Sequence, residues 1–372
     1  MTHAAPPRLT LSQRWRRLRT SPRFPFVLFF GLLAAGGLSQ AYCYWWDIRI
    51  ERMLVRNKGY AERIHFYPHW LRKYLGHKFV ARFEPIQNVR LRMDDPESSE
   101  THPHDLGLLR GALFLQELDF VGELSKEDVR CLRHLTGLKT ARFWHNPELA
   151  LDGVERLPKL TSLMFPFESS TAPDVYRRVA CLKRLERFAC VIRDDTRDST
   201  QVEMGLRELA RSQSLRRLDT RIVGDEQFLA LASFFSDGSP SLPQLNELRI
   251  AGSKNVSPRG LDSLKNLPSL IHLDLSYSGI ANDRLASLKE LPYLRTLYLE
   301  ANPNVTDDGV VILASMHNLQ SLNVKRTGIT FEGLLRLASL PRLRCLRADP
   351  GGSKARAELR KRLPAGCELD AN

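Results

Sequence analysis

The sequence predicts an α/β solenoid in which parallel strands form the concave face and helices form the convex face. One observation is a leucine repeat, clearest between residues 242 and 346, whose leading leucines stand 24 or 25 residues apart. These residues are Leu245, Leu270, Leu294, Leu319 and Leu343. The other observation is that a second leucine follows three residues after each of them. A pattern of L-x-x-L-x-L at this period is typical of a leucine-rich repeat horseshoe.

Each unit is expected to begin with a short strand and a turn. The strand is the L-x-L segment, whose leucines point to one face while the residues between them point to the other. A small polar residue follows in the clearest units: Ser253, Ser278, Asn302 and Thr327. Such side chains, when buried, can satisfy the backbone groups of the adjacent turn.

A helix should follow each turn. Ser257, Thr306 and Thr330 stand where an N-cap residue belongs, and Pro258 occupies a first helical position, which suits a residue without an N–H. The helices end at Leu-Pro pairs such as residues 267–268 and 291–292, because proline disfavours helical geometry in the residue before it. These signals place the strand inside the curve and the helix outside it.

Earlier units follow the pattern less strictly. Their leading leucines, at positions 115, 138, 160, 185 and 215, stand 22 to 30 residues apart. Ile86, Val89 and Leu91 are expected to form the first strand, and about eleven strands are expected in all. We therefore assign residues 86–349 to the repeats, 350–372 to a C-terminal cap, and 47–85 to a juxtamembrane segment with an N-terminal cap, because the first repeat would otherwise expose its core.

One transmembrane helix is predicted before the repeats, at residues 24–46. This stretch carries no charge, and a helix of its length reaches about 34 Å, enough to span a bilayer core of about 30 Å. Residues 1–23 form a basic tail with six arginines and no acid, which favours a cytoplasmic N-terminus and repeats on the extracytoplasmic side of the cytoplasmic membrane. The alternative is a cleaved signal peptide that ends at residues 39–41.

Charge and cysteine content restrict the function classes. The formal net charge is +13, and the basic residues concentrated beside the apolar stretch favour a membrane over nucleic acid. The six cysteines lie far apart in the sequence, so neither a zinc site nor a dense disulfide framework is indicated. A bridge between Cys345 and Cys367 in the C-terminal cap stays an open alternative.

The candidate partner site is the middle of the concave face. Arginines from neighbouring strands would form a basic stripe beside an apolar patch, and Trp, Tyr and Arg dominate interface energetics. The chosen residues are Arg142, Trp144, Met164, Arg187, Arg217, Arg221, Arg249 and Tyr298. A solvated face of mixed charge is the alternative, because Asp219, Glu247 and Asp274 interrupt the stripe.

Enzymatic chemistry is not indicated. His272 and Asp274 share one strand face and could serve as a general base pair, but no partnered nucleophile accompanies them. His102 and His104 lie in a polar loop without further metal ligands. We therefore expect no catalytic residue, no cofactor and no metal.

Two resemblances to known proteins add to this interpretation. Segments such as Val305-Thr306-Asp307-Asp308-Gly309-Val310 resemble the cysteine-containing type of leucine-rich repeat, which also occurs in F-box proteins. The whole arrangement resembles bacterial single-pass membrane-anchored leucine-rich-repeat proteins, through Pro68, Trp70, Leu71, Arg72, Leu75 and Gly76. No F-box is recognisable. The resemblance implies the fold and leaves the function open.

The sequence thus predicts a membrane-anchored module that binds a protein partner on its concave face. The alternative is a scaffold that binds an anionic polymer, glycan or nucleic acid, through the arginine stripe. Nucleic acid is the less favoured partner. The salt dependence of binding would distinguish the protein-binding hypothesis from the polyanion hypothesis, because affinity for a polyanion falls steeply with ionic strength.

Overall fold

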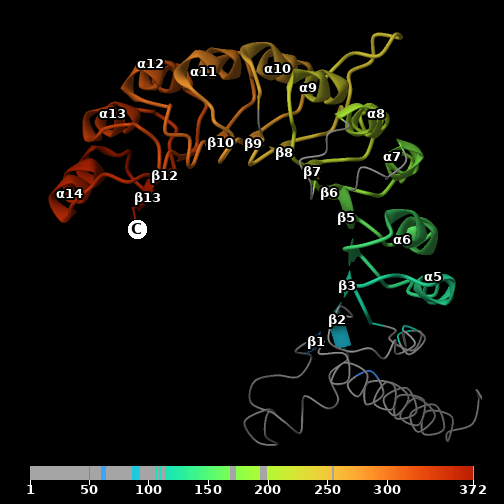
Figure 1. The fold of residues 1–372 in the computed structure, drawn as a ribbon. Coiled ribbons are helices and arrows are strands. Elements are labelled where there is room, and N and C mark those ends of the chain that lie inside the picture. The colour runs from blue at the N-terminus through green and yellow to red at the C-terminus, as the bar shows by residue number, and fades with distance from the viewer. Residues whose placement is uncertain are drawn as a thin grey trace, which may run out of the picture.

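The computed structural model describes residues 114–371 except 168–172, 193–198 and 254, together with residues 60–63 and 86–92 and the single residues 50, 106 and 109. This part of the chain forms one curved solenoid, with strands along its inner side and helices along its outer side (Figure 1). The predicted leucine-rich repeat horseshoe is therefore confirmed.

The sheet is 13-stranded and follows chain order throughout. All neighbours from the second strand onward pair in parallel, and only the first pair is antiparallel. The strands are β1 (Tyr60–Arg63), β2 (Ile86–Arg92), β3 (Glu117–Val121), β4 (Thr140–Phe143), β5 (Ser162–Phe167), β6 (Arg187–Ile192), β7 (Arg217–Asp219), β8 (Glu247–Arg249), β9 (His272–Asp274), β10 (Thr296–Tyr298), β11 (Ser321–Asn323), β12 (Cys345–Arg347) and β13 (Glu368–Asp370).

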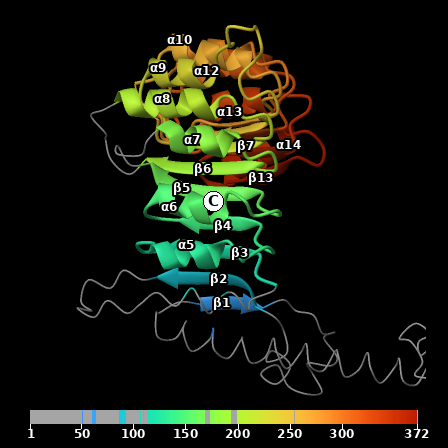
Figure 2. The same cartoon turned by 90° about the vertical axis from the view of Figure 1, so that its right-hand side faces the viewer.

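The helices lie side by side on the convex side, stacked one repeat above the next (Figure 2). They are α5 (Lys126–Leu132), α6 (Pro147–Val154), α7 (Pro173–Ala180), α8 (Ser199–Leu209), α9 (Asp225–Leu231), α10 (Pro258–Asp262) with the 3₁₀ turn η2 (Ser263–Asn266), α11 (Asn282–Lys289), α12 (Asp307–Ser315), α13 (Phe331–Leu337) and α14 (Ser353–Arg362).

The leucine lattice forms the core between these two layers. Leu248, Leu273, Leu297, Leu322 and Leu346 are register partners on adjacent parallel strands, and each is at most 1% exposed. Aligned leucines of this kind bury one another continuously from repeat to repeat, which no single repeat could achieve alone.

Aromatic residues replace leucine in the looser early repeats. Phe120, Phe143, Phe165 and Phe188 are buried, and the centroids of successive rings lie 6.5, 6.2 and 6.1 Å apart. Such spacing permits the tilted and edge-to-face contacts that aromatic pairs prefer. The early units therefore deviate from the leucine pattern because a column of phenylalanine rings fills the same volume.

Two features at the ends of the sheet differ from the expectation of about eleven strands. The first expected strand is present as β2, but β1 precedes it and pairs with it antiparallel. At the other end, residues assigned to a C-terminal cap form α14 and β13, and β13 pairs in parallel with β12. The cap thus continues the repeat geometry to the last described strand.

Side chains link the helix start of one repeat to the turn of the next. Thr306 and Thr330 occupy N-cap positions, as predicted, but neither side chain caps its own helix. Instead Asn282 Oδ1 accepts the Thr306 N–H at 2.9 Å, and Asp307 Oδ1 accepts the Thr330 N–H at 2.9 Å. Ser257 does cap its helix, by accepting the Arg259 N–H at 3.1 Å. Ser257 receives the same kind of contact, because Asp225 Oδ1 accepts its N–H at 2.8 Å, so a side chain from the preceding repeat holds all three N-cap residues.

Glycine three residues after each of these three N-caps leaves room for this contact. A Cβ on Gly309 would stand 2.4 Å from Asn282 Oδ1 and 2.7 Å from Leu285 Cδ1. We expect Gly309→Ala to lower the free energy of unfolding by about 1–3 kcal/mol, the usual cost of overpacking, as measured by urea denaturation. Gly352→Ala is the control, because a Cβ there meets nothing within 4 Å. Equal stability of the two variants would contradict this packing.

None of the helices in the described residues combines the length and apolarity needed to cross a membrane. The predicted transmembrane helix at residues 24–46 and the basic tail at 1–23 lie outside the described part of the chain. The segment with Pro68, Trp70 and Gly76 lies outside it as well.

Candidate functional site

The concave face presents two rows of side chains, one on each side of the buried central residue of every strand. Parallel pairing without register shifts aligns each row across neighbouring strands. From β6 to β11 the first row is Arg187, Arg217, Glu247, His272, Thr296 and Ser321. The second row is Ala189, Asp219, Arg249, Asp274, Tyr298 and Asn323.

Near the N-terminal end, the predicted site residues Arg142 and Trp144 contact acids on β3. The Trp144 indole Nε1 donates to Asp119 Oδ1 at 2.9 Å. Asp119 also faces Arg90 at 3.2 Å, and Arg142 lies 3.9 Å from Glu117. These contacts hold Trp144 toward β3 and neutralise both arginines.

Arg217 and Arg249 form a charge cluster with Asp219 and Glu247. Arg217 Nη2 lies 3.0 Å from Asp219 Oδ2, and its Nη1 lies 3.5 Å from Glu247 Oε1. Arg249 Nε donates to Glu247 Oε1 at 2.7 Å and lies 3.7 Å from Asp219 Oδ1. Two cations and two carboxylates thus compensate one another, and little positive potential remains for a polyanion.

The predicted stripe of four arginines is not contiguous. Arg187 and Arg217 are register partners, but Arg249 lies in the other row, beside Asp219. Arg221 follows the end of β7, and its Nε donates to the carbonyl of Gly252 at 2.9 Å. The structure therefore divides these residues among different surroundings.

An apolar patch lies on β5 and β6. Met164 and Ala189 are register partners in the second row, and both are partly exposed. Arg187, the first residue of β6, is exposed and makes no ion pair with any described residue. An uncompensated cation beside apolar side chains distinguishes this patch from the charge cluster next to it.

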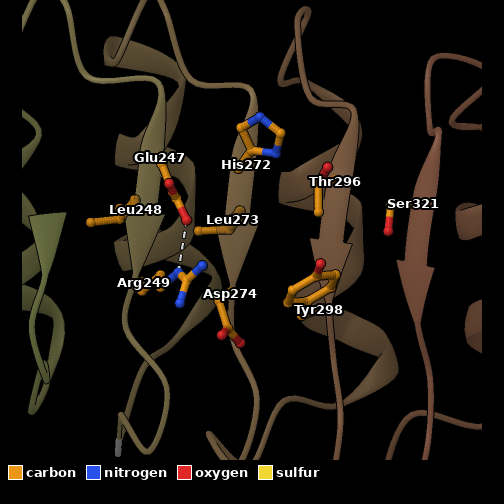
Figure 3. A pocket seen from close by; sticks show the side chains of 9 residues that line it. All are labelled: Glu247, Leu248, Arg249, His272, Leu273, Asp274, Thr296, Tyr298 and Ser321. Carbon is orange, nitrogen blue, oxygen red and sulfur yellow. Dashed lines mark hydrogen bonds and ion pairs between the residues drawn. The ribbon is translucent and has the colours of Figure 1, made fainter. Parts of the chain in front are cut away.

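A hollow of about 230 Å³ occupies the concave face over β8 to β11 (Figure 3). The Glu247–Arg249 pair forms one wall, and Tyr298 lies on the opposite side. His272, Asp274, Thr296 and Ser321 line the rest. Side chains from separate repeats thus form a polar depression with one aromatic wall.

Tyr298 also connects the hollow to the C-terminal repeats. The guanidinium of Arg347 lies 5.5 Å from the centre of the Tyr298 ring, a cation–π distance. Asp370 holds both neighbouring cations, with its carboxylate 2.8 Å from Lys325 Nζ and 3.6 Å from Arg347 Nε. These contacts fix the orientation of the Tyr298 ring.

The sequence interpretation missed four residues of the hollow. It placed His272, Asp274 and Thr296 on the concave face, but it weighed the first two as a catalytic pair and Asp274 also as an acid that interrupts the arginine stripe. It did not choose any of the four as a partner-binding residue. All four stand one residue from a central leucine. That shared register position is a signal that could have identified them, but curvature decides which repeats are close enough to enclose a depression.

Potential metal ligands do not cluster in the described residues. No hydrogen bond joins His272 to Asp274 within them, and no group of three or more potential metal ligands is present there. Cys131 and Cys190 are buried, as expected of core thiols, whereas Cys181 is exposed at the end of α7. Burial raises the pKa of Cys190 to about 12, so this thiol stays protonated at neutral pH. Cys345 and Cys367 are free thiols.

Comparisons with known proteins give fold likeness alone. No protein-family model matches the sequence, and no curated protein matches it. An internalin from Listeria monocytogenes matches with a TM-score of 0.42 and 17% identity over 71% of this chain and 69% of that chain. A yeast structure of the Rad7 and Elc1 complex matches with a TM-score of 0.45 and 16% identity over 96% of this chain and 92% of that chain. The repeat geometry described above, rather than these likenesses, defines the fold.

Proposed function

We propose that this chain is a protein-binding module whose concave face holds a segment of a protein partner. The observation that carries the proposal is the contrast between two neighbouring regions of that face. The charge cluster on β7 and β8 is satisfied internally. The patch on β5 and β6 instead partly exposes Met164 and Ala189 near Arg187, which has no ion-pair partner among the described residues. An apolar anchor next to a free guanidinium is the composition of an interface hot spot.

The two regions suggest how a partner would lie. An apolar side chain of the partner would contact Met164, and a nearby carboxylate would pair with Arg187. Further along, the hollow between Arg249 and Tyr298 would accept a polar side chain of the same segment. The distance from β5 to β11 is six strand spacings of about 4.8 Å, or roughly 29 Å, which an extended segment of about nine residues covers.

The anionic-polymer alternative receives less support on this face. A concave arginine stripe would need several uncompensated cations in sequence, and Arg142, Arg217 and Arg249 all have acidic neighbours within 4 Å. Nucleic acid therefore stays disfavoured. We further propose a non-enzymatic scaffold with repeats of the cysteine-containing type, anchored in the cytoplasmic membrane by residues 24–46 with its N-terminus inside and its repeats outside. The uncharged sequence of the segment supports this anchor.

Variants of the concave patch test the proposal. With the affinity-tagged full chain in detergent, we expect Met164→Asp combined with Arg187→Glu to lower partner capture at least tenfold, since each buried anchor contributes about 2 kcal/mol. Tyr298→Ala should lower capture by loss of the aromatic wall. Capture is quantified by mass spectrometry against the unaltered chain.

A matched convex variant provides the control. Val311 and Arg336 are exposed on α12 and α13. Val311→Asp combined with Arg336→Glu therefore introduces one apolar-to-acid and one cation-to-acid change on the opposite face, as the concave variant does on its own. The convex variant should capture the same partners as the unaltered chain. Loss of the same partners from the convex variant alone would show that the concave assignment is wrong.

A further inference from the structure

A second surface lies on the edge of the solenoid where helices lead into strands. Because the strands run parallel, the turns after α5, α6, α7 and α8 lie along the same edge, and these repeats stack one above another (Figure 2). The turns are residues 133–139, 155–161, 181–186 and 210–216. We call this surface the basic edge. Its exposed cations are Arg133, Lys139, Arg156, Lys159, Lys183, Arg184, Arg211 and Arg216.

Acids compensate the basic edge very little. Only Glu155 and Glu186 occur in the same turns, and Glu155 is already bonded to Arg178 at 2.6 Å. Lys139, Arg156, Lys159, Lys183 and Arg216 make no ion pair with any described residue. Arg211 pairs with Glu208 at 3.8 Å. Among the described residues, the five cations named above therefore remain uncompensated, unlike the arginines of the charge cluster.

Helix dipoles do not account for these cations. A positive side chain is favoured at a helix C-terminus, but the effect falls off within the last turn. Lys159 follows Val154, the last residue of α6, by five positions, and Arg216 follows Leu209, the last residue of α8, by seven. Lys159 lies in the turn three residues before β5, and Arg216 directly precedes β7. Their charge therefore needs a different explanation.

A groove of about 750 Å³ lies within the basic edge. Lys183, Arg184 and Arg216 line it, together with polar side chains including those of Gln213 and Ser214. The lining also includes the carboxylate of Glu186, so its cations outnumber its acids by three to one, and it contains no large apolar side chain. That composition suits phosphate groups better than the apolar and aromatic anchors on which protein interfaces depend.

We propose that the basic edge docks on an anionic membrane surface through lipid phosphate headgroups. The choice of a membrane rests on the proposed anchor at residues 24–46. Only residues 47–59 separate that segment from β1, so β1 lies within about 45 Å of the bilayer even when they are fully extended. The edge begins beside β4, three strand spacings or about 15 Å beyond β1. Docking there would orient the horseshoe relative to the membrane and leave its concave face free.

A proximity measurement tests this orientation. The full chain is placed in lipid nanodiscs that contain a headgroup nitroxide quencher, with a fluorophore on Cys181, which is exposed in the groove. Cys43, Cys345 and Cys367 are changed to Ser. Each cation near an anionic surface strengthens association about fivefold. We expect the docked-to-undocked ratio to be at least tenfold higher with phosphatidylglycerol than with phosphatidylcholine alone, and to decrease in 0.5 M salt.

Two controls make the result specific. The triple change Lys159→Glu, Lys183→Glu and Arg216→Glu should abolish the gain, whereas the equal charge change Lys126→Glu, Lys354→Glu and Arg360→Glu outside the edge should preserve it. In a second labelled chain, Cys181 is changed to Ser and the fluorophore is attached to Glu148→Cys at the opposite edge. Its quenching should not increase with phosphatidylglycerol. The proposal would be overturned by equal quenching in both lipids or by an equal loss of quenching in both triple variants. It would also be overturned if polyglutamate displaced the basic edge from the membrane at a lower charge concentration than that of phosphatidylglycerol.

The outcomes separate this proposal from the previous one. The triple edge variant should retain the partner captured by the concave face, and the Met164→Asp, Arg187→Glu variant should retain lipid-dependent quenching. If the chain does not insert into nanodiscs, the assignment of residues 24–46 as a membrane anchor is wrong. The same quenching measurement, with lipid vesicles added to the chain, then tests lipid docking by the basic edge independently of the anchor. Absence of phosphatidylglycerol-dependent quenching there would overturn the proposal.

Discussion

Asn302→Ala should lower the free energy of unfolding by more than about 3 kcal/mol. The side chain is fully buried. Its Oδ1 accepts the N–H groups of Ser278 and Ile280 at 3.2 and 2.9 Å, and its Nδ2 donates to the carbonyls of Leu275 and Leu299 at 3.0 and 2.9 Å. Alanine leaves these buried backbone groups without partners, and each unsatisfied group costs about 1–3 kcal/mol.

Urea denaturation followed by circular dichroism measures this loss. Asn318→Ala is the matched control, because Asn318 is exposed and bonds the Pro292 carbonyl and the Arg342 guanidinium at the surface, where water can replace it. We expect a change below about 1 kcal/mol for the control. Similar losses for both variants would show that Asn302 does not hold adjacent turns together.

Leu273→Ala and Leu297→Ala should each lower the free energy of unfolding by about 2–5 kcal/mol. Each residue is at most 1% exposed, and the two are register partners in the centre of the lattice. Removal of the side chain loses buried apolar area and leaves a cavity that neighbouring repeats cannot fill. The same denaturation measurement applies.

Two substitutions on the same strand test the register. His272→Ala should have almost no effect because His272 is exposed. Asp274→Ala should cost about 1 kcal/mol, the contribution of the bond that Asp274 Oδ1 accepts from the Ser276 N–H at 3.0 Å. A cost for either residue equal to that of Leu273→Ala would mean that the strand faces are exchanged.

The predictable part of the candidate site is the side of the sheet on which its residues lie. Alternation along a strand assigned Arg217, Arg249 and Tyr298 to the face opposite the leucines, and the observed burial pattern of β7, β8 and β10 agrees. Alternation does not specify which neighbours each guanidinium meets. Arg217 pairs with Asp219 on its own strand and with Glu247 on the next, and such pairing depends on rotamers and on lateral register.

The basic edge escaped sequence analysis for a related reason. Lys159, Lys183 and Arg216 are separated by 24 and 33 residues, so the local sequence does not show that they share one edge. Only the stacking of α6, α7 and α8 brings their turns to one edge. Thr306 and Thr330 show the same dependence on neighbours, because the hydrogen bonds they make with the preceding repeat replace the capping expected from the local sequence.

The sequence by itself determined the architecture of this protein: a strand, a turn and a helix per repeat, with the leucine lattice buried and the curvature placing strands inside. Periodic burial is a local property, and it repeats in every unit. The tertiary structure alone decided which charges are neutralised, where the face is hollowed, and which cations remain uncompensated along the edge. Those properties depend on contacts between neighbouring repeats as well as within one strand, and the distances between repeats are set only when the repeats stack.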